Sequence, residues 1–341
     1  MGGRLWCSRW FASAVFVLQE GKDMTTKTIM VALGGNAIKS ADDEGTAAEQ
    51  FANVYKTSRE LVKLIKAGYR LVVTHGNGPQ AGNLLIQQEE GKRLVPDMPL
   101  DVVGAMTQGQ LGYMFTQALG NLLRAEGITT PVAAIVNQVR VSPDDPDYKD
   151  PSKPVGPFFT KAQADELAVS RPNWKIKQVK PETVEKRFRR VVASPQPIAN
   201  VEVDVIRKMI DAGIIVVASG GGGVPVVEGK DGLEGSAAVI DKDLAGAKLA
   251  ELIDADVFLI LTDVSHAKLN YGKPDEQNVG EVSLSEMKEL AARGDFLAGS
   301  MGPKVRACMK FVENGGGRAI ITSLDHAFEA ITEGFGTQIV G

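Results

Sequence analysis

Hydrophobic residues along the chain form two patterns. Some lie in short, continuous β-branched runs, and others recur with helical periodicity over longer stretches. Apolar runs predict buried strands at 29–33, 70–74, 132–136, 214–218, 257–261 and 318–322. Helical spacing predicts helices at 46–67, 101–126, 202–212, 243–253 and 302–314, with another helix opening near Gln80. Because strands and helices alternate, the sequence predicts βαβ units and a largely parallel sheet covered on both faces.

Residues 141–190 interrupt this alternation. The segment opens with turn-forming residues around Pro143 and Pro151, and residues 175–190 are rich in charge. One interpretation is a surface loop with solvated lysines, and the other is a lid insertion that protrudes beside an active site. The α/β pattern resumes at Val191-Val192-Ala193.

The N-terminal segment fits the fold poorly. Arg4 and Arg9 precede an apolar run at 10–18, which faintly resembles a signal peptide, but no small-residue cleavage site follows. Met24 is a second possible start directly before the first strand. We therefore expect residues 1–26 to form an extension outside the fold and residues 27–341 to form the folded domain, with an export signal as the alternative.

Composition narrows the class of protein. The net charge of −4 gives no electrostatic reason to bind nucleic acid. The two cysteines, Cys7 and Cys308, lie far apart, and the three histidines lack metal-ligand spacing, so no metal site is predicted. No apolar stretch reaches the roughly 20 residues that cross a bilayer. These features are typical of a cytoplasmic protein without a membrane partner.

Three of the predicted strands end in glycine clusters, which are Gly34-Gly35-Asn36, Gly76-Asn77-Gly78 and Gly220 to Gly223. Backbone without side chains leaves N–H groups free to cradle phosphate oxygens, especially where a helix begins next. Glycine also serves tight turns for purely steric reasons. The recurrence of the pattern at three strand ends favours a phosphate site.

Two lysines lie in unusual settings. Lys242 stands between Asp241 and Asp243 at a predicted helix start, and these aspartates are expected to hold it in place. Lys304 follows a glycine-rich turn at another helix start, where the helix dipole disfavours a cation unless an anion is also present. Solvated surface lysines are the alternative. The motifs of P-loop proteins, dinucleotide-binding folds, protein kinases and serine hydrolases are absent.

These motifs together resemble the carbamate kinase family, whose wider relatives are the amino-acid kinases. The resemblance covers residues 27–341 and includes the segments Pro151 to Gly156, Leu261 to Val264 and Gly299 to Lys304. It implies a three-layer α/β/α sandwich around a central, mostly parallel sheet, with a protruding lid subdomain. The family usually has an acidic residue where Ala237 stands, threonine at Ser152 and tyrosine at Phe159.

The resemblance also assigns residues to roles. Its catalytic and orienting residues are Lys242, Lys304, Asp243 and the lid lysine Lys153. Its phosphate-binding residues are Gly34, Gly35, Asn36, Gly76, Asn77, Gly78, Gly221 and Gly222. Its nucleotide-binding residues are Asp263, Val264, Tyr271, Met301 and Pro303.

The activity implied is reversible phosphoryl transfer between ATP and carbamate, giving ADP and carbamoyl phosphate. Mg²⁺ would be held mainly by the nucleotide phosphates, and the resemblance further implies a homodimer and ATP formation in arginine fermentation. Two alternatives stay open. Another amino-acid kinase would need an arginine or polar patch for its acceptor, and the sequence offers no clear candidate. A catalytically inactive sensor of ATP or carbamoyl phosphate would be expected to lack the lysines.

Overall fold

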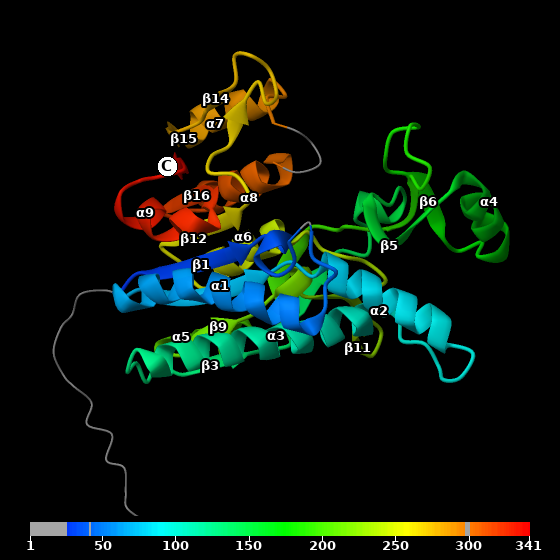
Figure 1. Ribbon diagram of the computed structural model, residues 1–341, viewed down its shortest axis with the longest axis horizontal. Helices are drawn as coiled ribbons and strands as arrows, with labels where there is room; N and C mark the ends of the chain where they lie inside the picture. Colours follow the sequence, from blue (N-terminus) through cyan, green and yellow to red (C-terminus); the bar gives the residue numbers. More distant parts are fainter. Residues whose placement is uncertain (1–25, 41, 297–300) are drawn as a thin grey trace, which may run out of the picture.

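The computed structural model describes residues 26–40, 42–296 and 301–341. Its main body is a sheet between two layers of helices, with one small subdomain standing away from it (Figure 1). The predicted N-terminal extension lies outside the described residues except for its last residue, as do residues 297–300 of the glycine-rich turn before Lys304.

The central sheet has eight strands in the order β15-β17-β16-β12-β1-β2-β9-β3. Their bounds are β1 (Thr28–Leu33), β2 (Arg70–His75), β3 (Val132–Ala134), β9 (Ile215–Val217), β12 (Val257–Thr262), β15 (Glu281–Ser283), β16 (Arg318–Ser323) and β17 (Thr337–Val340). Neighbouring strands are parallel except for β16 and β17, which are antiparallel. The predicted, mostly parallel sheet is therefore confirmed.

Helices cover both faces of this sheet. One face packs against α1 (Ala47–Lys66), α3 (Leu100–Ala125) and α9 (Ala327–Thr332). The other packs against α5 (Val203–Asp211), α6 (Lys242–Leu252), α7 (Leu284–Ala292) and α8 (Met301–Glu313). Alternate side chains of β1 divide between the layers, because Ile29 and Val31 enter the first core and Met30 enters the second. The three-layer α/β/α fold follows from this alternation.

Local signals position the helix ends as the sequence predicts. The Thr46 hydroxyl accepts from the Glu49 N–H at 3.3 Å, and the Glu49 carboxylate accepts from the Thr46 N–H at 2.8 Å. This reciprocal cap begins α1 one residue after the predicted start. Gly68, with φ of +91°, follows the helix in a left-handed conformation that glycine adopts without strain.

Several short strands were not predicted. A second sheet has the order β11-β10-β4-β8, with β4 (Gln138–Val141), β8 (Pro197–Asn200), β10 (Val224–Gly229) and β11 (Gly232–Gly235). A two-stranded hairpin pairs β13 (Lys268–Leu269) with β14 (Gln277–Asn278). Short elements carry too few apolar positions to show a period, which explains why β15, α7, α9 and β17 were missed as well.

The segment from Lys153 to Val192 forms its own unit, here called the protruding subdomain (Figure 1). It contains β5 (Lys153–Phe159), α4 (Lys161–Ser170), β6 (Lys175–Gln178) and β7 (Phe188–Val192), with an antiparallel sheet β5-β7-β6. The expectation that the main α/β pattern resumes at Val191 was wrong, because Val191 pairs with Pro154 and Lys175 inside this sheet. The surface-loop interpretation of 141–190 was also wrong, since most of this segment is regular structure.

Among the helices that the described ranges contain, none combines the length and apolar character needed to cross a membrane.

Candidate active site

The three glycine turns come together at one edge of the central sheet. They follow β1, β2 and β9, which are neighbours in the sheet and run parallel. The second turn leads directly into α2 (Gly78–Gly91), and the other two lead into single 3₁₀ turns. The carboxyl edge of an open parallel sheet is where α/β proteins bind their ligands.

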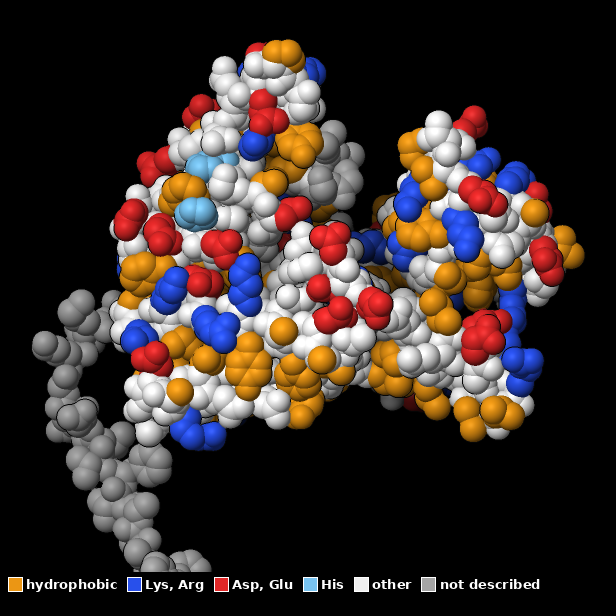
Figure 2. Space-filling view, in the orientation of Figure 1, with side chains coloured by type: hydrophobic (Ala, Val, Ile, Leu, Met, Phe, Trp, Pro, Cys, Tyr) orange, Lys and Arg blue, Asp and Glu red, His pale blue; other side chains and the backbone are white. Residues whose placement is uncertain are grey.

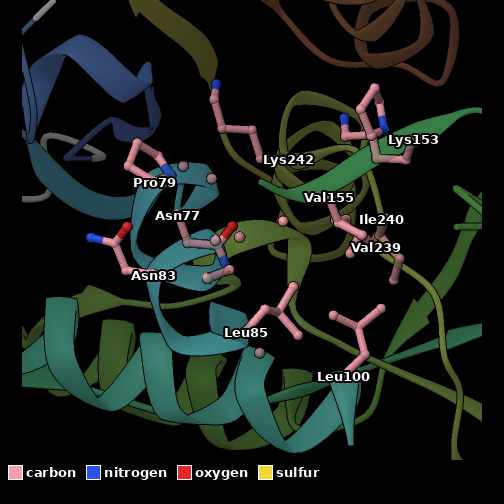
Figure 3. A pocket seen from close by; sticks show the side chains of 18 of the residues that line it. Asn77, Pro79, Asn83, Leu85, Leu100, Lys153, Val155, Val239, Ile240 and Lys242 are labelled. Carbon is pink, nitrogen blue, oxygen red and sulfur yellow. The ribbon is translucent and has the colours of Figure 1, made fainter. Parts of the chain in front are cut away.

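A cavity of about 600 Å³, here called the large cavity, opens at this edge. Seven of the predicted site residues line it, namely Gly35, Gly76, Asn77, Gly78, Lys153, Gly221 and Lys242. Lys242 and Lys153 reach it from different elements, while Leu85, Leu100, Val155 and Val239 form an apolar wall (Figure 3). One end of the cavity is therefore polar and cationic, and the other is apolar.

The glycines of the three turns serve different purposes. A Cβ on Gly221, whose φ is +65°, would lie 2.1 Å from the Asn77 amide nitrogen, and a Cβ on Gly222 would lie 2.3 Å from the Ile240 carbonyl oxygen. The steric interpretation therefore holds for this turn. A Cβ placed on Gly35 or Gly78 would meet no atom within 4 Å, so the backbone of these two residues borders open space. The phosphate interpretation fits those two best.

A buried polar network that sequence reasoning missed supports the third turn. Ser219 has a left-handed backbone with φ of +53°. Its hydroxyl accepts from the side-chain amides of Asn137 at 3.1 Å and Asn200 at 3.0 Å, and its N–H donates to the Asn137 side chain at 2.6 Å. These contacts join residues up to 82 positions apart, so no local pattern identifies them.

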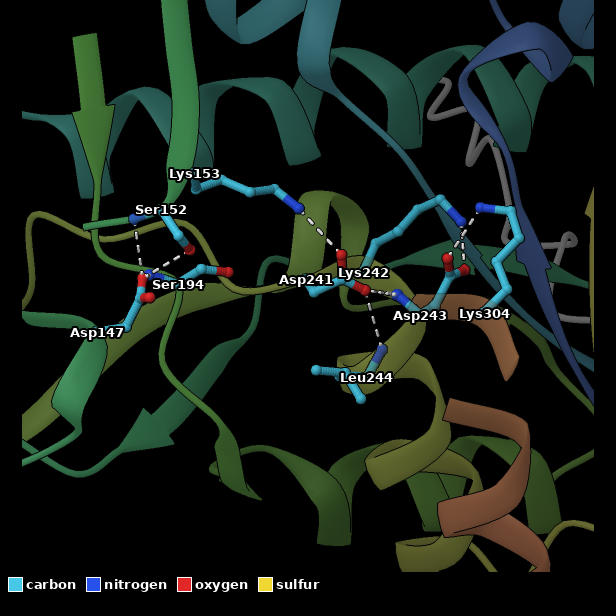
Figure 4. A network of polar contacts seen from close by, with 9 residues as sticks. All are labelled: Asp147, Ser152, Lys153, Ser194, Asp241, Lys242, Asp243, Leu244 and Lys304. Carbon is cyan, nitrogen blue, oxygen red and sulfur yellow. Dashed lines mark hydrogen bonds and ion pairs between the residues drawn. The ribbon is translucent and has the colours of Figure 1, made fainter. Parts of the chain in front are cut away.

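Asp243 joins the two predicted catalytic lysines (Figure 4). One carboxylate oxygen accepts from the Lys242 ammonium, and the other accepts from the Lys304 ammonium at 3.1 Å. All three side chains are largely buried, with Asp243 only 4% exposed. Burial lowers the pKa of Lys242, and the nearby Lys304 cation lowers it further against the opposing pull of Asp243.

Asp241 has a different role from the one expected. It was predicted to hold Lys242, but its Oδ2 accepts from Lys153 at 3.0 Å, and its Oδ1 accepts from the Asp243 and Leu244 N–H groups at 3.0 and 3.3 Å. Asp241 thus caps α6 and binds the protruding subdomain. Burial opposes its ionisation, but the Lys153 and Lys242 cations outweigh burial and lower the pKa of Asp241.

A smaller cavity of about 130 Å³ borders Lys304. Four predicted nucleotide-binding residues line it, namely Asp263, Val264, Tyr271 and Met301, together with Lys304. Sequence reasoning missed His266, Lys268 and Phe296, which also line it. Because Lys304 borders this cavity and Lys242 borders the large one, Asp243 connects the two spaces.

Besides Asp243, four predicted site residues line neither cavity. Gly34 is buried and its N–H donates to the Leu261 carbonyl at 2.9 Å. Gly222 is buried against Ile240, Asn36 is exposed, and Pro303 lies half-buried in the first turn of α8. Ala237, where the family usually has an acidic residue, is exposed and borders neither space.

Arg189 is a cavity residue that sequence reasoning did not single out. The expectation that no arginine is available for an acceptor therefore needs correction. The Arg189 guanidinium donates to the Gly156 carbonyl at 2.6 Å and lies 4.8 Å from the centre of the Phe158 ring. Burial lowers the pKa of Arg189. These contacts tie its charged group to the backbone of β5.

Asp147 connects both ends of the protruding subdomain (Figure 4). Its Oδ2 accepts from the Ser152 N–H at 3.3 Å, from the Ser152 hydroxyl at 3.1 Å and from the Ser194 N–H at 2.5 Å. Ser152 directly precedes β5 and Ser194 follows β7. This carboxylate therefore fixes the two connections beside each other, next to Lys153.

Comparison with known proteins agrees with this geometry. The sequence profile described as the amino acid kinase family matches residues 27–323. Carbamate kinase from Thermococcus kodakarensis is 50% identical over 317 residues, covering 92% of this chain and 99% of that protein. Carbamate kinase from Pyrococcus horikoshii is 47% identical over 313 residues, covering 91% and 98%.

Solved structures give the same result. Carbamate kinase from Giardia lamblia bound to AMP-PNP is 41% identical, with a TM-score of 0.87 over 93% of this chain and 99% of that chain. The fold and the matched profile define a kinase, that is, a phosphotransferase. The chain belongs to the amino acid kinase family, and within it to the carbamate kinases.

Proposed function

We propose that this enzyme transfers a phosphoryl group reversibly between ATP and carbamate. The observation that carries the proposal is the position of Asp243, which holds Lys242 on the large cavity and Lys304 on the small one. A nucleotide in the small cavity would point its terminal phosphate at this lysine pair. An acceptor in the large cavity would meet the same phosphate from the opposite side.

The chemistry needs charge and position rather than a base. Carbamate is already an anion, so its oxygen attacks without losing a proton. The bond from the γ-phosphorus to the β,γ-bridging oxygen breaks as the bond to the carbamate oxygen forms. Lys242 and the N–H groups of Gly35 and Gly78 would hold the transferred group. Lys304 would offset charge that develops on the bridging oxygen.

Mg²⁺ would enter with the nucleotide. No group of three or more His, Cys, Asp or Glu side chains is arranged to hold a metal ion within the described part of the chain. Asp241 and Asp243, the acidic residues nearest the lysines, are both paired with lysine. We therefore expect the phosphates and water to supply most of the ligands of Mg²⁺.

The protruding subdomain would act as a lid. Carbamate has four heavy atoms, so its own contacts supply at most about −6 kcal/mol, at a ceiling of roughly −1.5 kcal/mol per atom. A cavity of about 600 Å³ is far larger than this substrate. Closure over it would exclude water and protect the labile carbamoyl phosphate, with Lys153 as the lid residue nearest the phosphate.

The alternatives receive less support from the site. An amino-acid acceptor would need a cation for its carboxylate. The Arg189 guanidinium borders the large cavity, but it already donates to the Gly156 carbonyl and lies over the Phe158 ring, and its buried Nε has no partner among the described residues. An inactive sensor would not need Lys242 and Lys304 beside each other on one buried carboxylate.

The cellular role is part of the proposal. We infer formation of ATP from carbamoyl phosphate in the cytoplasm, as in arginine fermentation. We also infer a homodimer, for which the apolar side chains exposed along α3, Val102, Met106 and Tyr113, offer a surface.

The test is whether ATP forms from ADP and carbamoyl phosphate in the presence of Mg²⁺. A coupled enzyme assay detects the ATP as it is produced. The reverse reaction is measured with ATP and carbamate, and then with N-acetylglutamate, aspartate, glutamate and UMP as acceptors. Of these acceptors, we expect only carbamate to be phosphorylated. Faster turnover with any amino-acid acceptor or with UMP would place the enzyme in a sister family.

A further inference from the structure

The Asp241 carboxylate makes two kinds of contact at once. Its Oδ1 caps α6 through the N–H groups of Asp243 and Leu244, at 3.0 and 3.3 Å. Its Oδ2 accepts from the Lys153 ammonium at 3.0 Å, across 88 positions of sequence (Figure 4). The same side chain therefore joins the helix that carries Lys242 and Asp243 to the first residue of the protruding subdomain.

This ion pair occupies the lysine that faces the cavity from the protruding subdomain. Lys153 lines the large cavity and its side chain is 34% exposed, whereas the Asp241 side chain is 18% exposed. An anion in the cavity would compete with Asp241 for the ammonium group. If Lys153 left, Asp241 would keep its two backbone N–H partners and the nearby Lys242 cation, so its charge would not be left uncompensated.

The connections of the subdomain limit how far this lysine moves. Asp147 holds the N–H groups of Ser152 and Ser194, which lie on the two connections. The backbone of Lys153 is thereby fixed beside the main body, while its four-carbon side chain can still turn. Exchange of partners therefore needs only rotation of the side chain and a small closing movement.

We propose that Asp241 is a positioning residue that holds Lys153 when the site is empty and releases it to the phosphate group of the bound substrate. The identity of that substrate, carbamoyl phosphate, rests on the proposed function. The Lys153–Asp241 pair is then a resting-state contact that the ligand must break. Asp241 therefore has two effects. It competes with the anion for Lys153 and so lowers the affinity of the empty site, and it keeps Lys153 close to the place where the anion binds.

The test is a double-mutant cycle of Asp241→Asn and Lys153→Ala. Asparagine keeps the side-chain oxygen that caps α6 but removes the charge that attracts Lys153. Freeing a partly exposed ion pair is worth about 1.4- to fivefold in binding. We therefore expect D241N to lower the KM for carbamoyl phosphate by about this factor, and K153A to raise it while ADP affinity is kept. In the K153A background, D241N should lower KM by a clearly smaller factor, because only the direct repulsion between Asp241 and the anion is then removed.

A matched control is an ion pair between a lysine of the same subdomain and an aspartate just before it. Lys177 pairs with Asp150 at 2.5 Å, and Asp150 is exposed and lines neither cavity. Asp150→Asn removes a charge of the same sign near the same sheet and should leave KM unchanged. If D150N lowers KM as D241N does, the effect comes from general charge and the proposal is wrong.

Binding of inorganic phosphate, measured by calorimetry on the four proteins of the cycle, gives the same comparison without turnover. Wild-type enzyme that forms no ATP from carbamoyl phosphate would refute the proposed function, and the phosphate cycle would still decide the role of Asp241. An effect of D241N that is equal with and without Lys153 would show that Asp241 acts through α6 alone, which overturns the proposal. An unchanged or higher KM in D241N alone would also overturn it.

Discussion

His75 makes the stability of the enzyme depend on pH. It ends β2, is 1% exposed and stacks on Phe115 with ring centres 5.6 Å apart. Its Nδ1 lies 3.0 Å from the Gly76 carbonyl oxygen, which can only accept, so the neutral ring carries its proton on Nδ1. Burial lowers the pKa of His75 to about 4, and the Lys242 cation acts in the same direction. A Cβ on Gly220 would lie 2.4 Å from this ring, so His75 supports the third glycine turn.

The sign and size of the effect follow from linkage. The unfolded chain takes up a proton near pH 6.5 and the folded chain near pH 4, so stability is lost as pH falls between these values. The shift corresponds to about 3 kcal/mol in total. About 2 kcal/mol of this disappears between pH 7 and pH 5. At pH 7 and above the contribution is fully present.

The measurement is the free energy of unfolding by urea at several pH values between 7 and 5. The control is His75→Asn, whose amide can still donate to Gly76 but does not titrate. The variant will be less stable at pH 7 because the smaller side chain leaves space beneath Gly220. The comparison is therefore between the changes in the free energy of unfolding with pH, and not between the free energies themselves. We expect the wild-type curve to fall by about 2 kcal/mol more than that of the variant. Parallel curves would show that His75 is not held neutral by burial.

Three further predictions test the rest of the site. Lys242→Ala and Lys304→Ala should each lower kcat on the order of 10²–10³ with the fold retained, and near wild-type kcat in either variant would refute its role. Gly221→Ala should destabilise the fold by at least about 1–2 kcal/mol from its left-handed backbone alone. Gly82→Ala is the control and should not destabilise it, because a Cβ on Gly82 in α2 meets no atom within 4 Å. Equal unfolding midpoints for the two variants would contradict this prediction. Asp147→Ala should raise the KM for carbamoyl phosphate about three- to tenfold through its lost hydrogen bonds while ADP affinity stays constant, and altered ADP affinity would show a wider disturbance.

The main fold was predictable because its signals are local. The β-branched runs of β1, β2 and β12 and the cap at Thr46 each lie within a few residues, and the structure places these elements within one or two residues of the prediction. The second sheet and the protruding sheet depend instead on pairings between distant segments, such as Val139 with Asn200. Short strands of this kind are specified by their partners rather than by their own pattern.

The candidate site was predictable in its residue types but not in its connections. The sequence places Asp241 beside Lys242, and adjacency suggested a pair between them. The structure pairs Asp241 with Lys153 instead. Asp241 is the N-cap of α6, so one of its oxygens accepts from the helix N–H groups and the other faces Lys153, while Lys242 pairs with its other neighbour, Asp243. Arg189 was missed for a similar reason, since its approach to the cavity depends on pairing of β7 with β5.

The charges of the site explain why a separate subdomain supplies one of its lysines. Lys242 and Lys304 are matched by Asp241 and Asp243, so without Lys153 these buried groups balance and offer an anion no net attraction. Lys153 makes the balance positive. The subdomain that carries it holds ten Lys and Arg residues against four Asp and Glu within 153–192, while the whole chain carries −4. Figure 2 shows several Lys and Arg side chains on the visible face of the subdomain, among acidic and apolar ones. Unpaired charge in a partly buried site is costly. Under the proposal above, Lys153 stays paired with Asp241 until a phosphate takes it, so the surplus cation is not left unpaired in the empty site.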